Sequence, residues 1–149
     1  MLGTLTDIQI DNLLTRNAVG RIGYHDGVKT YITPVTYVFD GVHVIGQSNE
    51  GSKLSIMRKN PFVCFEVDAM SSMSNWESVI AWGNFEELYE NEALQARKYL
   101  YNSILDLLTA PSVHPHEHEP NHLIDDSNRI KQVMYRIKLT EKTGRFESR

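Results

Sequence analysis

The sequence has a single cysteine, no long apolar run and no block of basic residues. One cysteine excludes a disulfide within the chain, and the apolar neighbours of Cys64 predict a thiol buried in the core. No stretch reaches the roughly 18 apolar residues that span a membrane, and residues 1–11 lack the pattern of a secretory signal. These absences predict a cytoplasmic protein that does not enter a membrane.

Excess positive charge is also absent, because the 149 residues carry a formal net charge of -4 when histidine is neutral. Such a chain has no overall attraction to a phosphate polymer, so nucleic acid is not an expected partner. The hydrophobic content of 41% is enough for one core. We expect a single domain over residues 1–149, with a loose tail over 145–149.

The first part of the chain predicts a helix followed by an antiparallel meander. Thr6 and Gln9 have the spacing of a capping box, which predicts a helix over residues 7–17. Three runs rich in β-branched and aromatic residues follow, and the Asp-Gly pairs at 26–27 and 40–41 predict hairpin turns between them. Pro34 cannot donate to a sheet ladder, so its strand should be bent, bulged or at an edge.

The rest of the chain adds strands and two more helices. Residues 46–53 predict a polar loop, and a short helix follows that ends at Asn60 and Pro61. We expect strands over 62–67 and 76–89 with a loop over 68–75 between them, and a bulge at Gly83. A helix over 91–109, a loop rich in histidine and proline over 111–127 and a strand over 133–139 complete the chain. The absence of βαβ alternation predicts a mainly β, antiparallel barrel with peripheral helices.

The polar loop contains the residue types of an anion site. Ser48, Asn49 and Lys53 surround Gly51 at a predicted helix start, where unpaired N–H groups and the helix dipole favour a phosphate. A capped helix with a solvated Lys53 explains the same residues and is the commoner arrangement. Taken alone, the residues of this loop favour a helix cap over an anion site.

The order of the motifs carries more information than any one of them. The strand around Pro34 comes first, the loop over 46–53 second, Asn60-Pro61 with the strand over 63–68 third, and residues 76–79 with Gly83 fourth. This order resembles the FMN-binding split-barrel proteins related to pyridoxamine 5′-phosphate oxidase, in particular their nitroimidazole-reductase-like branch. The similarity runs from residue 5 to about residue 145 and is weakest over 107–127.

The resemblance implies a six-stranded split β-barrel that forms a homodimer with FMN between the subunits. The implied FMN-binding residues are Pro34, Val35, Thr36 and Tyr37 along the flavin ring, Gln47, Ser48, Asn49 and Lys53 near the phosphate, and Trp76, Ser78 and Trp82 across the subunit interface. Ordinary strand packing explains Trp82 equally well. Many relatives have histidine where this chain has Gln47, which can donate a hydrogen bond but supplies no charge.

The loop over 111–127 contains four of the six histidines. Alternating imidazole and carboxylate groups can ligate zinc, nickel or copper, but the prolines do not hold them on one face, so no metal site is expected. A lid in which His116 or His118 contacts substrate is a second alternative. An ordinary polar loop is the leading interpretation.

The resulting hypothesis is an FMN-dependent oxidoreductase that acts on a small molecule, with NAD(P)H as a possible donor. The basic residues expected for the phosphate of a pyridoxamine phosphate substrate are missing, so that activity is not expected. No catalytic side chain is identified. Three alternatives stay open: a non-catalytic FMN carrier or redox sensor, a heme-binding split barrel, and a plain interaction domain.

Overall fold

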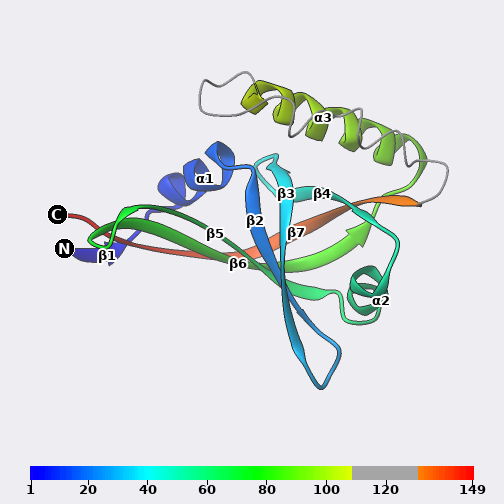
Figure 1. Ribbon diagram of the computed structural model, residues 1–149, viewed down its shortest axis with the longest axis horizontal. Helices are drawn as coiled ribbons and strands as arrows, with labels where there is room; N and C mark the ends of the chain where they lie inside the picture. The colour runs from blue at the N-terminus through cyan, green and yellow to red at the C-terminus, as the bar shows by residue number, and fades with distance from the viewer. Residues whose placement is uncertain (109–130) are drawn as a thin grey trace.

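The computed structural model describes residues 1–108 and 131–149. The elements in chain order are β1 (Leu2–Thr4), α1 (Asp7–Arg16), β2 (Val19–His25), β3 (Thr30–Phe39), β4 (His43–Asn49), α2 (Ser52–Lys59), β5 (Phe62–Ser72), β6 (Asn75–Glu87), α3 (Glu90–Leu108) and β7 (Gln132–Glu147) (Figure 1).

Six of these strands close into a ring. The strand order is β1-β7-β4-β3-β2-β5-β6, and a further pairing of β6 with β7 joins the two sides of the sheet. Every pairing is antiparallel, and β1 only adds to the end of β7. The prediction of a mainly β, antiparallel six-stranded barrel is therefore confirmed.

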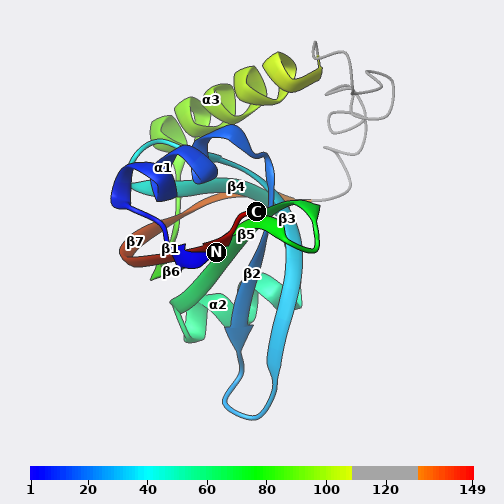
Figure 2. The same ribbon diagram turned by 90° about the vertical axis from the view of Figure 1, so that its left-hand side faces the viewer.

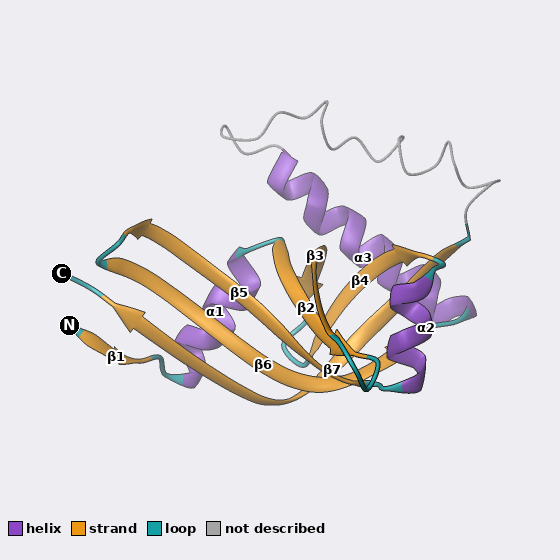
Figure 3. Ribbon diagram, turned by 60° about the horizontal axis from the view of Figure 1, so that its bottom comes forward, coloured by secondary structure: helices purple, strands orange, loops and turns teal. Residues whose placement is uncertain are grey.

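The helices cover different parts of this barrel. Buried side chains of α1 and α2 belong to the same core as the inward side chains of the strands, and the two helices lie toward different ends of the barrel (Figure 3). By contrast, α3 packs on the outer face, where Ala96 and Leu100 contact a separate cluster with Ile45 and Met134. Figure 2 shows α3 running along the outside of the barrel. No helix of residues 1–108 and 131–149 has the length and apolar character needed to span a membrane.

The start of α1 confirms the predicted capping box. The backbone N–H of Gln9 donates to the Thr6 hydroxyl at 3.2 Å, and the Thr6 N–H donates to the Gln9 side chain at 2.8 Å. Tyr37 in β3 then fixes the other end of the helix, because its hydroxyl donates to the backbone oxygen of Leu14 at 2.7 Å. Burial raises the pKa of Tyr37, so this hydroxyl keeps its proton.

Three segments that were predicted as loops or tail belong to strands. Residues 46–49 continue β4 and pair with β7, residues 68–72 continue β5 and pair with β6, and residues 145–147 lie in β7 between β1 and β6. These predictions were wrong because the segments are polar and partly exposed, whereas backbone pairing with long neighbouring strands decides their conformation.

The position of Cys64 is also corrected. Its neighbours Val63 and Phe65 are buried, but Cys64 itself is only partly buried because alternate residues of β5 face opposite sides of the sheet. The thiol lies on the outer face.

Gly83 lies at the predicted bulge. Trp82 pairs with Glu141 and Gly83 with Leu139, so the extra residue is Thr140 on the opposite strand. A Cβ atom on Gly83 would lie 2.2 Å from the backbone oxygen of Lys138. Since backbone cannot move aside as a flexible side chain can, this close approach of β6 and β7 requires glycine.

We predict that Gly83→Ala lowers the free energy of unfolding by about 2–3 kcal/mol, because the added methyl group forces β6 and β7 apart. Urea unfolding followed by circular dichroism measures the change. Asn84→Ala, at the exposed neighbouring position in β6, is the matched control and should change stability by less than about 0.5 kcal/mol. Equal stability of Gly83→Ala and wild type would contradict the packing described here.

Candidate functional site

The barrel opens where β3 and β4 separate. These strands pair only from Tyr37↔Gly46 to Phe39↔Val44. Beyond this point, residues 30–36 of β3 pair with β2 alone, and residues 47–49 of β4 pair with β7 alone. Within the described part of the chain, the edge of β3 over residues 30–36 and the edge of β4 over residues 47–49 therefore have no strand ladder between them.

The free edge of β3 presents backbone groups at regular intervals. The N–H of Tyr37 donates to the oxygen of Ala18, and the N–H of Asp26 donates to the oxygen of Lys29. These two bonds show which residue pairs of the β2–β3 ladder are hydrogen-bonded. Because hydrogen-bonded and non-hydrogen-bonded pairs alternate, the Arg21–Pro34 pair is a non-hydrogen-bonded one. Pro34 thus removes no ladder bond, which agrees with its predicted place at an edge. Its C=O and the N–H of Thr36 point to the side where the pairing with β4 ends.

The side chains of this segment divide between the two faces of β3. Val35 and Tyr37 are buried in the barrel core, whereas Pro34 and Thr36 face outward. Any contact of Val35 or Tyr37 with a ligand on the outer face would have to come from the backbone. The implied roles of these four residues stay predictions.

The same alternation divides the polar residues at the end of β4. Gln47 lies on the face that α3 covers, and its Oε1 accepts a hydrogen bond from the Tyr101 hydroxyl at 3.3 Å. Asn49 follows on the same face, whereas Ser48 lies on the opposite face, and its hydroxyl donates to the backbone oxygen of Asn49 at 3.2 Å. The structure therefore does not bring Gln47 and Ser48 to one side of the strand.

The start of α2 lies directly after this segment. Gly51 is the N-cap, and no side chain caps the first turn. Lys53 follows as a partly buried residue, and burial lowers the pKa of its ammonium group. No carboxylate of the described residues forms an ion pair with Lys53. The local electrostatics thus favour an anion at this turn.

Trp76, Ser78 and Trp82 lie on the outer face of β6. Each alternates with a core residue of the strand, and the indole N–H of Trp76 donates to Glu147 at 3.1 Å. Strands β2 and β5 lie between β6 and β3 in the sheet. At about 4.8 Å per strand, these residues are roughly 14 Å from the free edge of β3. One chain does not bring the two groups together.

The outer face of β2, β3, β5 and β6 is rich in exposed apolar side chains. They are Val19, Ile32, Phe62, Met70 and Ile80, with exposures between 41% and 73%. Arg21 lies among them, 3.2 Å from Glu66 and 3.8 Å from Asp68. Burial raises the pKa of Glu66, and the neighbouring Asp68 adds to this shift. On the outer face of β3, α3 packs against Val38, whereas the five apolar side chains named above stay exposed.

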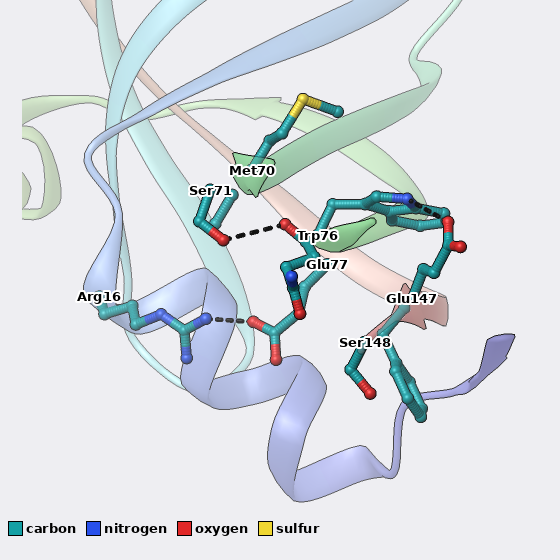
Figure 4. A pocket seen from close by; sticks show the side chains of 10 residues that line it. Arg16, Met70, Ser71, Trp76, Glu77, Glu147 and Ser148 are labelled. Carbon is teal, nitrogen blue, oxygen red and sulfur yellow. Dashed lines mark hydrogen bonds and ion pairs between the residues drawn. The ribbon is translucent and has the colours of Figure 1, made fainter. Parts of the chain in front are cut away.

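Two cavities lined by described residues lie away from the β3–β4 opening. The first, of about 420 Å³, lies between the β5–β6 hairpin and the end of β7, and Trp76, Met70 and Phe146 line it together with the ion pair of Arg16 and Glu77 (Figure 4). The second, of about 330 Å³, lies between α3 and the sheet beside Ile45. Of the predicted site residues, only Trp76 lines either cavity.

Several contacts at the site could not be read from sequence. Tyr101 holds Gln47 across 54 residues of chain, and Arg58 binds Glu50 and Glu87. No spacing rule links these residues. His116 and His118 lie outside the described residues, and no metal-binding cluster of His, Cys, Asp or Glu occurs in residues 1–108 and 131–149.

Comparisons with known proteins agree with this architecture. A FAD-binding protein from Mesorhizobium loti has a similar structure, with a TM-score of 0.78, 26% identity and 99% of both chains covered. A 5-nitroimidazole antibiotic resistance protein from Bacteroides thetaiotaomicron shares the fold, with a TM-score of 0.70 and 13% identity over 98% of this chain and 89% of the other.

A curated sequence relative matches over a shorter stretch. The uncharacterized protein RA0666 of Rhizobium meliloti (strain 1021) is 36% identical over 58 residues, which is 39% of this chain and 38% of that protein. The family model of pyridoxamine 5′-phosphate oxidase, in contrast, matches residues 6–146. Together with the ring of six antiparallel strands, this match shows that the chain belongs to the pyridoxamine 5′-phosphate oxidase family.

Proposed function

We propose that the protein binds FMN at the opening between β3 and β4 and works as an FMN-dependent oxidoreductase. The observation that carries this proposal is the juxtaposition of two features at the same opening: the unpaired edge of β3 and the uncapped start of α2 with Lys53. In this proposal the flavin ring of FMN contacts the edge of β3, and its phosphate contacts Lys53 and the start of α2. The FAD-binding relative from Mesorhizobium loti supports a flavin in this fold.

The residues present fit the chemical groups of FMN. The pyrimidine side of the flavin ring carries N–H and C=O groups, which complement the backbone groups of Pro34 and Thr36 at the free edge. The phosphate is a dianion near neutral pH, which fits Lys53 and the first N–H groups of α2. Asn49 on the outer face is a further candidate donor.

When bound, FMN supplies the electron or hydride transfer, and the protein binds and orients the ring and limits the access of water. NAD(P)H is the proposed electron donor and a small organic molecule the acceptor. Steady-state oxidation of NAD(P)H with a panel of acceptors separates an enzyme from a carrier or sensor, because a carrier gives only a slow rate that is independent of the acceptor.

We further propose that two copies of the chain associate through the apolar outer face of β2, β3, β5 and β6. In one chain, Trp76 and Ser78 are too far from the β3 edge to contact the same ring. A partner that covers this face would remove the exposed apolar side chains from water and bring its own β6 toward the opening.

We predict that Lys53→Ala weakens FMN binding about tenfold, because a charge-assisted contact contributes roughly 1.5–3 kcal/mol. Quenching of flavin fluorescence measures the dissociation constant. Riboflavin, which has no phosphate, is the matched probe and should bind both variants equally. If well-folded wild-type protein binds neither FMN nor FAD, the flavin proposal is wrong. A Soret band after reconstitution with heme would then favour a heme-binding protein.

The pH dependence of the same titration is an independent control. Because burial lowers the pKa of Lys53, the wild-type affinity for FMN should begin to fall at a lower pH than for an ordinary lysine. The affinity is full while the ammonium is protonated and decreases as the pH rises through this pKa. Lys53→Ala should show no such decrease, so parallel curves would argue against contact between Lys53 and the phosphate.

We predict that Ile80→Glu shifts the protein from dimer to monomer, because it places a charge on the apolar face, where Ile80 is exposed. Light scattering should give about twice the chain mass of 17.1 kDa for wild type and one chain mass for the variant. Leu94→Glu, exposed on α3 away from this face, should stay dimeric. A monomeric wild type would exclude the proposed association.

A further inference from the structure

Arg58 joins three elements around the start of α2. From the last turn of α2, its guanidinium donates to both carboxylate oxygens of Glu50, at 2.7 and 2.8 Å. It also donates twice to Oε1 of Glu87 at the end of β6, at 2.8 and 2.6 Å. The Glu87 side chain is only 12% exposed. Arg58 therefore fixes the end of β4, the body of α2 and the end of β6 to one another.

The position of Glu50 makes this contact relevant to the candidate site. Glu50 directly precedes Gly51, the N-cap of α2. A carboxylate there is well placed to accept hydrogen bonds from the first turn of the helix and is favoured by the helix dipole. No side chain caps the turn, and both oxygens of Glu50 are bound by Arg58.

The hydrogen bonds from Arg58 occupy the Glu50 carboxylate, and no side chain accepts a hydrogen bond from the first turn of α2. The hydrogen bonds from Arg58 also hold the pKa of Glu50 below its usual value, so Glu50 is charged at neutral pH. A free Glu50 carboxylate would therefore be a charged competitor at the anion-binding turn.

We propose that Arg58 is a positioning residue that keeps the Glu50 carboxylate away from the start of α2 and so reserves this turn for the phosphate of the cofactor, an inference that rests on the proposed FMN function. Arg58 acts in two ways. It neutralises a negative charge beside the phosphate, and it removes an internal acceptor from the N–H groups of the first turn. Arg58 itself does not contact the cofactor.

The test compares FMN with riboflavin on Arg58→Ala, Glu50→Gln and the double variant. Arg58→Ala frees Glu50 and should weaken FMN binding roughly tenfold, whereas riboflavin affinity should change less than about twofold. The double variant has no charged competitor and should recover FMN affinity to within about threefold of wild type. Glu50→Gln alone should bind FMN about as tightly as wild type.

A matched control removes a cation elsewhere. Lys142→Ala breaks the 2.7 Å ion pair with Asp11 of α1 and changes the net charge by the same amount. It should leave FMN affinity unchanged. The loss in Arg58→Ala should also shrink as salt is raised, since a charge effect at a partly exposed site is screened.

The outcomes separate this inference from the proposed function. If wild type does not bind FMN, both fail. If wild type binds FMN and Arg58→Ala binds it equally, only the role of Arg58 is wrong. Equal losses for FMN and riboflavin, without recovery in the double variant, would show that Arg58 only stabilises the fold. If Arg58→Ala does not fold, Arg58→Gln keeps a hydrogen-bond donor without the charge, and an unchanged FMN affinity in that variant overturns the proposal.

Discussion

The pairing of β6 with β7 is the constraint on which the rest of the molecule depends. Without it, the other strands form an open sheet with two long edges. The ladder runs from Trp76↔Glu147 to Glu87↔Tyr135 and passes a bulge at Thr140 that lets both strands bend. The ring stays closed although β3 and β4, separated from this junction only by the β7–β4 pairing, pair over three residues. The opening between β3 and β4 therefore does not break the barrel.

Local sequence signals predicted the elements well. The capping box, the Asp-Gly turns and Pro34 each depend on neighbouring residues, and all three features lie where their chemistry places them. The errors concern strand length. Residues 47–49, Arg145 and Glu147 have polar side chains, and pairing with a distant strand, β7 or β6, makes these segments extended. Pairing between residues far apart in the chain has no local signal.

The candidate site was predictable as a set of residue types but not as an arrangement. The strand alternation that places Thr36 outward also turns Tyr37 inward, and in β4 it separates Gln47 from Ser48. Sequence order alone treats such neighbours as one group. Contacts that hold the site, from Tyr101 and Arg58, join residues through tertiary packing, and their chemistry is common to many surface side chains. Only the three-dimensional structure distinguishes them.

The place of Cys64 gives the outer face a built-in chemical reporter. Gly23 lies opposite Cys64, and a Cβ atom there would be 2.6 Å from the sulfur, so the thiol fills the space that glycine leaves. Trp82 is its neighbour on the other side. Since the chain has no other cysteine, a maleimide dye or a spin label reacts at one defined point beside a fluorescent indole. The rate of that reaction depends on the solvent exposure of the outer face, and its measurement requires no engineered residue.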